Sequence, residues 1–172
     1  MFGSPRKFFL NFEAEGSLRE PAIYAGIVGV ISGVLAVVLG PLFAALLDSG
    51  TGEVFGLTPI EGLGFAVVYP AFVALAAGVY LLAIQVFIGK VGSFGQLFRM
   101  SAYAFSGMIF AWLPFIGAFA ITYSLLVAMV IGIRYVFSTT LITALVVTLT
   151  GFVPLSLGLI ALRGVAFQIF GA

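Results

Sequence analysis

The sequence predicts an all-α integral membrane protein: a polytopic bundle of five transmembrane helices preceded by a short interfacial helix. Of its 172 residues, 63% are hydrophobic and only 8% are charged, whereas soluble domains have about 45–50% and 25%. The apolar residues also gather in long runs between the charges, and a helix needs about 20 mostly apolar residues to cross a bilayer. Polar side chains are too few to cover a globule in water, so the chain is predicted to lie in the membrane.

Residues 1–20 are predicted to form a cytoplasmic segment that contains the interfacial helix. Phe8 and Phe9 are adjacent there and directly follow Arg6 and Lys7. In such a helix the aromatic rings reach the acyl boundary while the cations reach anionic headgroups. The segment is interpreted as an anchor that fixes the direction of the first span, and a docking surface for a cytoplasmic partner is the alternative.

The five spans are predicted from apolar runs within a domain that covers residues 21–172. They lie at about residues 22–47, 60–88, 94–113, 115–135 and 139–162. The run from Phe94 to Tyr135 is too long for one crossing. It is divided at Pro114, which disfavours helix at the residue before it, and at Gly117, which permits a tight turn.

Local signals support some of these boundaries. Ser93, followed three residues later by Gln96, has the form of a capping box at the start of the third span. Pro70 and Pro154 fall inside spans, where we expect them to kink the helices while neighbouring groups satisfy the freed carbonyls.

The basic residues predict the orientation of the chain. With five spans, most of the lysines and arginines fall on the N-terminal side, namely Arg6, Lys7, Arg19, Lys90, Arg99 and Arg134. By the positive-inside rule the N-terminus is cytoplasmic and the C-terminus lies outside. These side chains are expected at the membrane surface, where long basic residues extend to the headgroups.

Small residues form two regular rows. The first span carries them at spacings of four and three, at Ala22, Gly26, Gly29, Gly33, Ala36 and Gly40. The fourth span carries Ala120, Ser124, Ala128 and Gly132. Such rows let helix backbones approach closely in a bilayer. Both close packing inside the monomer and a homodimer interface fit the first row, and the second row is its candidate partner within or between chains.

Catalysis is not expected from this composition. The chain has neither histidine nor cysteine, which removes the imidazole base of a serine protease and the usual zinc ligands. Asp48 is the only aspartate, and its group with Glu53 and Glu61 is interpreted as a solvated loop and a helix cap, with a weak cation site as the alternative. No enzymatic activity, cofactor or metal site is predicted, and the net charge of +1 gives no basic surface for nucleic acid.

Transport is the alternative that the sequence leaves open. Coupled transporters usually place ionisable residues at the midplane, and the predicted spans do not. Their main polar groups are Gln85, Tyr103, Ser106, Thr122, Tyr123 and Thr148. Most of these can be satisfied by hydrogen bonds to helix carbonyls, so a lipid-facing groove or a hydrophobic conduit is the form of transport that fits.

Several short motifs follow one another along the second half of the chain in a recognisable order. They are GKVGSFGQLFRMSAYA at residues 89–104, WLPFIG at 112–117 and IGIRY at 131–135, followed by Ser138, Thr139 and Ala144. Together with SPRKFF at residues 4–9, this set resembles the Yip family, the Ypt/Rab-GTPase-interacting membrane proteins. The positions that match the family pattern are Pro5, Phe8, Phe9, Tyr103, Pro114, Gly117 and Arg134.

The resemblance implies a five-span helical domain with a cytoplasmic N-terminus. For eukaryotic members it also implies vesicle traffic, binding of Rab-type small GTPases and association with other family members. Those members carry a longer cytoplasmic region than residues 1–20 provide, so the chain resembles a prokaryotic-type member.

We therefore expect a non-enzymatic scaffold or adaptor that associates with itself and acts in membrane organisation or trafficking. The alternative is a small transporter, channel or scramblase-like, lipid-handling protein. The expected partners are membrane lipids, further copies of the chain or related Yip-type proteins and, by resemblance only, a small GTPase.

Overall fold

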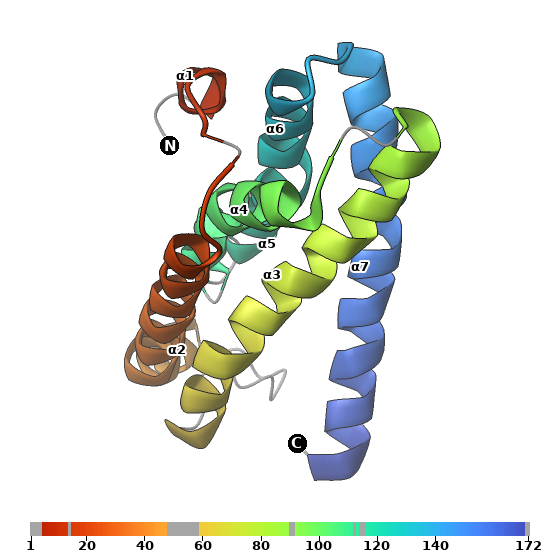
Figure 1. The fold of residues 1–172 in the computed structure, drawn as a ribbon. Coiled ribbons are helices and arrows are strands. Elements are labelled where there is room, and N and C mark those ends of the chain that lie inside the picture. Colours follow the sequence, from red (N-terminus) through yellow and green to blue (C-terminus); the bar gives the residue numbers. More distant parts are fainter. Residues whose placement is uncertain are drawn as a thin grey trace.

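The computed structural model describes residues 5–13, 15–47, 59–89, 92–111, 113 and 116–170, and all regular elements in these ranges are helices (Figure 1). The α-helices are α1 (Pro5–Leu10), α2 (Arg19–Leu47), α3 (Pro59–Phe87), α4 (Phe94–Ala104), α5 (Ile116–Thr122), α6 (Met129–Val136) and α7 (Leu141–Phe170). A 3-10 helix, η1 (Phe105–Phe110), continues α4, and a π-helix, η2 (Tyr123–Ala128), joins α5 to α6. The prediction of an all-helical chain is confirmed over these residues.

Four helical stretches are long and apolar enough to cross a membrane, so the chain is a membrane-embedded protein. They are Arg19–Leu42, Val67–Phe87, Ile116–Val136 and Leu141–Gly158. The predicted span at residues 94–113 is not among the four, because α4 has only 11 residues before the chain changes to 3-10 geometry. At a rise of about 1.5 Å per residue, α4 alone covers about half of a hydrocarbon core of about 30 Å.

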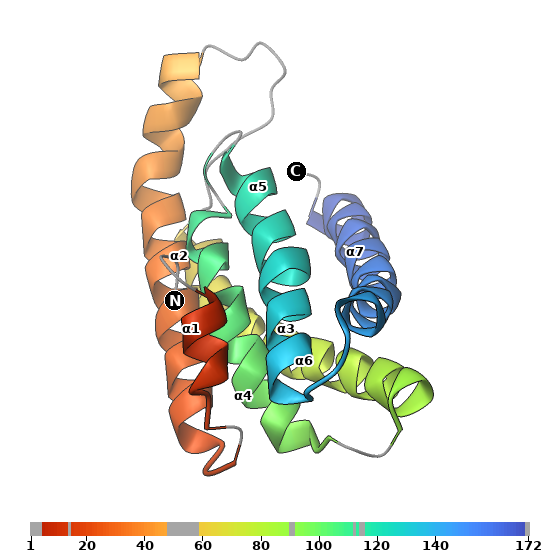
Figure 2. The same cartoon turned by 90° about the horizontal axis from the view of Figure 1, so that it is seen from above.

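Helix α4 and its continuation η1 lie at the centre of the molecule. Both views place α4 between α2 on one side and the α5–α6 stretch on the other (Figures 1 and 2). It contacts α2, α3 and α6, while α7 packs on the outside against α3 and α6. Most of α4 is buried, including Leu97, Met100 and Ala102. The other helices are therefore arranged around this central segment.

The predicted capping box at the start of α4 is confirmed. The Gln96 amide donates to Ser93 Oγ at 3.2 Å, and the Ser93 amide donates to Gln96 Oε1 at 3.1 Å. Helices α3 and α7 continue through Pro70 and Pro154 respectively.

Two tyrosines of α3 satisfy carbonyls where neighbouring helices leave α geometry. The Tyr69 hydroxyl donates to the Phe105 carbonyl at 2.7 Å, and the Tyr80 hydroxyl donates to the Leu125 carbonyl at 3.0 Å. Phe105 begins the 3-10 helix η1, and Leu125 lies within the π-helix η2. The bilayer core offers no water to such groups, so hydrogen bonds from α3 can stabilise both irregular segments.

The ring of Tyr80 is held between η2 and Gly151 of α7. A Cβ atom added at Gly151 would collide with this ring, with Tyr80 Cζ only 3.2 Å away. The ring is fully buried and its hydroxyl donates to Leu125, so it cannot move aside without straining that hydrogen bond. Glycine at position 151 therefore allows α7 to pack closely on α3.

We predict that Gly151→Ala lowers the free energy of unfolding by about 1–3 kcal/mol, the usual cost of overpacking a filled core. Gly158→Ala, on the same helix, is the matched control, because nothing lies within 4 Å of a Cβ added there. It should leave the stability unchanged or raise it by up to about 1 kcal/mol through helix propensity. Reversible unfolding in mixed micelles measures both values, and equal effects would contradict the packing described for Tyr80.

Candidate functional site

The N-terminal helix α1 is docked against the bundle by Phe9. This side chain is only 2% exposed, and α1 packs on α6. A Cβ atom added at Gly132 of α6 would lie 3.3 Å from Phe9 Cε1 and 2.9 Å from Met100 Sδ. Gly132 therefore leaves the space that Phe9 occupies. The helix predicted at the start of the chain is present, and its buried side faces protein.

Aromatic rings extend this contact from α1 to α2 and α4. The ring of Tyr103 in α4 lies with its centre 4.8 Å from that of Tyr24, 5.7 Å from that of Phe8 and 6.0 Å from that of Phe12. Phe8 and Phe9 meet edge to face at 5.1 Å. Edge-to-face and tilted pairs at such distances add stability beyond the burial of their area. The structure thus gathers three of the predicted motif positions, namely Phe8, Phe9 and Tyr103, at one place.

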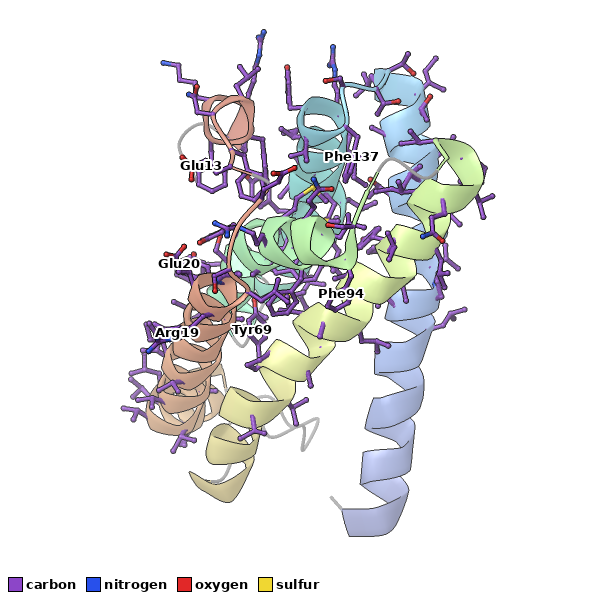
Figure 3. All side chains as sticks on the ribbon, viewed as in Figure 1. Glu13, Arg19, Glu20, Tyr69, Phe94 and Phe137 are labelled. Atoms are coloured by element: carbon purple, nitrogen blue, oxygen red, sulfur yellow. The ribbon has the colours of Figure 1, made fainter. Side chains whose placement is uncertain are left out.

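Arg99 points inward instead of extending to the headgroups as expected. The residue is 7% exposed. Its Nη1 donates to the Ser17 carbonyl at 3.0 Å, and its Nη2 lies 3.6 Å from Glu20 Oε2. The reason is that residues 15–18, which lead into α2, pass directly over the guanidinium. Figure 3 labels Glu20 at the start of α2, beside α4.

Gly16 is the residue that permits this close approach. Its φ of +135° is a backbone conformation that favours glycine. A Cβ atom there would also collide with the Arg99 guanidinium. Any side chain at residue 16 would therefore strain the backbone and would also force the Arg99 guanidinium to shift.

The remaining predicted surface cations fall into two groups. Arg6, Lys7, Arg19 and Arg134 are exposed, and their place at the membrane surface stays a prediction. Lys90 lies outside the described residues. So do Pro114, Asp48 and Glu53, and of Glu61 only the backbone in α3 is described.

The first row of small residues faces the interior of the single chain. Gly29, Gly33, Ala36 and Gly40 are buried, and Ala22 and Gly26 are half-buried. The main neighbours of α2 are α3, α4 and η1. Packing within one chain, one of the two interpretations of this row, accounts for the four buried members. Nothing lies within 4 Å of a Cβ atom added at Gly26, so no close approach requires glycine there.

The second row also lies inside the chain, with neighbours of its own. Ala120, Ser124, Ala128 and Gly132 are all buried. Ser124 lies directly against Gly107 of η1, where a Cβ atom would collide with Ser124 Oγ. The α5–η2–α6 stretch is not a principal neighbour of α2, so the structure does not pair the two rows within one chain.

Two irregular helices meet at the centre of the molecule, where η1 contacts η2. A π-helix inside a span is rare and often marks a functional position. Ser124 in η2 is fully buried, and its hydroxyl has no hydrogen-bond partner among the residues that the structure describes. Ser101 of α4 is in the same situation. A serine hydroxyl does not ionise near neutral pH, so these two groups cannot carry the charge that proton coupling requires.

The expectation that span hydroxyls bond to helix carbonyls is confirmed at two positions. Ser106 Oγ donates to the Tyr103 carbonyl at 2.7 Å, and Thr148 Oγ1 donates to the Ala144 carbonyl at 2.8 Å. Gln85 and Thr122 are exposed, and Tyr123 is half-buried.

At the end of η1, a Cβ atom at Gly117 would collide with the Ala111 backbone, so the close approach there requires glycine.

Sequence reasoning missed Tyr24, Tyr69 and Tyr80. Tyrosine is common at the membrane interfaces, whereas a buried tyrosine usually needs an acceptor for its hydroxyl. Tyr80 lies well inside an apolar run, and this position could have indicated a buried tyrosine that donates to a carbonyl.

Comparison with known proteins gives no match to a family model, to a curated protein or to a solved structure. The fold and these contacts define the class as an all-helical, membrane-embedded protein. Membership of the Yip family stays a prediction from the motifs.

We predict that Arg99→Met loosens the linker that leads into α2. The substitution removes a charged hydrogen bond to Ser17, and such bonds contribute about 1.5–3 kcal/mol. Amide hydrogen exchange at Arg19, whose backbone N–H donates to Ser17 Oγ at 3.1 Å, should become at least about tenfold faster in detergent. Glu20→Gln should change this rate less than about twofold, because the Glu20 side chain is 74% exposed. An equal effect of the two variants would contradict the role given to the Ser17 bond.

Proposed function

We propose that this chain is a non-enzymatic, Yip-type integral membrane protein that acts as a scaffold or adaptor in membrane organisation or trafficking. The observation that supports this proposal is the fixed N-terminal face, by which we mean the surface formed by α1 and residues 15–18. Phe9 and Arg99 attach α1 and its linker to the bundle, while Arg6 and Lys7 stay exposed. A surface of fixed shape loses little conformational entropy when a partner binds, which suits an adaptor.

The proposal includes a fifth crossing formed by α4 together with η1. At about 1.5 Å per α-helical and about 2.0 Å per 3-10 residue, the segment Phe94–Phe110 extends about 28 Å, close to the hydrocarbon thickness. With five crossings the exposed Arg6, Arg19 and Arg134 lie on one side of the membrane. The positive-inside rule then puts the N-terminus in the cytoplasm and the C-terminus outside.

The partners in this proposal are membrane lipids and further copies of the chain or related Yip-type proteins. A small GTPase, if one binds, would meet the N-terminal face. Since four of the six small residues in the row of α2 are buried within one chain, self-association would use other surfaces. Large apolar side chains are exposed on the outer faces, among them Val38 of α2, Leu82 of α3 and Ile142 of α7.

We predict a discrete dimer or larger complex when the mass of the protein is measured by light scattering in mild detergent. The chain contains no cysteine, so single cysteines can locate the interface by cross-linking in native membranes. Val38→Cys, Leu82→Cys and Ile142→Cys sample three exposed faces, and cross-links should concentrate on one of them. Gly33→Cys, at a buried position, is the control and should not cross-link.

Dilution with a co-expressed cysteine-free chain separates a specific complex from random collision. Self-association would be contradicted by a monomeric mass together with cross-linking that falls, on dilution, only as the frequency of random collisions falls.

The second candidate function is a small transporter, channel or lipid-handling protein, and the contact between η1 and η2 favours it. Helices interrupted at membrane depth line the binding sites of many transporters. The scaffold proposal expects liposomes containing the protein to show no more solute flux or phospholipid scrambling than empty liposomes. The methyl group of Gly107→Ala would collide with Ser124 Oγ. The second candidate would be favoured if Gly107→Ala lowered the flux or scrambling and the double variant Gly107→Ala/Ser124→Ala restored it.

A further inference from the structure

The contact between α1 and α6 repeats at positions three residues apart on both helices. Phe9 lies against Gly132, and the Arg6 guanidinium carbon lies 5.7 Å from the centre of the Tyr135 ring. Residues three apart share one face of a helix, so Arg6 and Phe9 face α6 together while Gly132 and Tyr135 face α1. The docking of Phe9 thus brings Arg6 to Tyr135.

A second arginine lies against the same ring. The guanidinium carbon of Arg134 is 5.5 Å from the centre of the Tyr135 ring. Both arginines are exposed, and within the described ranges neither forms an ion pair with a carboxylate; the ion pair found there joins Arg99 to Glu20. A tyrosine ring attracts each cation only weakly, by about 0.5–1 kcal/mol at an exposed site. Two like charges therefore share one ring without an anion between them.

We propose that Arg6, Arg134 and Tyr135 form a binding site for the phosphate group of an anionic lipid. Guanidinium groups present paired N–H donors that match phosphate oxygens, and this makes arginine well suited to phosphate recognition. One phosphate held by both arginines would offset their repulsion and join α1 to α6.

A lipid is the source of phosphate that the surroundings favour. The site lies at the end of the bundle formed by α1 and the C-terminal end of α6, where Figure 3 shows nitrogen-bearing side chains projecting outward. Leu10 is exposed and apolar, and it lies four residues after Arg6 on the same helix, so the two side chains are neighbours on the surface of α1. An exposed apolar residue beside paired cations is the combination that an interfacial lipid fits, with its chains in the apolar region and its phosphate at the cations.

Native mass spectrometry of the full chain in mild detergent tests the site, with phosphatidylglycerol as the anionic probe and phosphatidylcholine as the zwitterionic one. The double variant Arg6→Gln/Arg134→Gln should weaken phosphatidylglycerol binding at least about tenfold. Lys7→Gln/Arg19→Gln removes the same charge from exposed positions and should weaken it less than about threefold. Phosphatidylcholine binding should change less than about twofold in either variant. Equal losses of phosphatidylglycerol binding in the two double variants would overturn the proposal, because they would indicate diffuse attraction to surface charge.

Two further arms address the ring and the source of the phosphate. Tyr135→Phe keeps the ring and should retain binding within about twofold, whereas Tyr135→Leu should weaken it about threefold or more. Loss of binding in Tyr135→Phe as large as in Tyr135→Leu would overturn the role of the ring.

Millimolar glycerol 3-phosphate should not displace the lipid; displacement would overturn the lipid assignment in favour of a soluble phosphate ester.

Discussion

The structure depends on one requirement of the bilayer, that polar backbone groups find partners within the protein. The two central segments depart from α geometry at η1 and η2. Tyr69 and Tyr80 supply donors to carbonyls of these two elements. Helix α3 thus acts as a support for both, and it contacts the outer helix α7 as well. The central 3-10 and π geometry can persist because an adjacent regular helix carries the compensating hydroxyl groups.

Close contacts at glycines connect the central helices to the N-terminal face. Gly107 brings η1 against η2, Gly132 admits Phe9, and Gly16 lets the linker cross Arg99. At each of these positions a side chain from another segment lies where a Cβ atom would be, namely that of Ser124, Phe9 or Arg99 respectively. The N-terminal helix is therefore part of the packed bundle, and the positions of its exposed cations follow from the packing of buried groups.

The long helices were predictable from the sequence, whereas the contacts of polar side chains were not. Uninterrupted apolar runs indicate α2, α3 and α7, and the Ser93 capping box is a local pattern that requires no tertiary information. The change from α4 to η1 has no comparable signal, because apolar periodicity does not separate α from 3-10 geometry over six residues. Arg99 bonds to a residue 82 positions away, and Tyr80 to one 45 positions away. Such partners are determined only when the helices pack, so an arginine expected at headgroups is found under a linker.

The contact of Arg99 with the linker has a mechanical consequence. Along the chain, residues 15–18 lead only into α2. Through the Arg99–Ser17 hydrogen bond they are also connected directly to α4, which lies at the centre of the molecule (Figure 2). A force applied to the N-terminal segment would therefore be shared between α2 and α4 at this point. The load would reach the middle of the bundle without first travelling along α2.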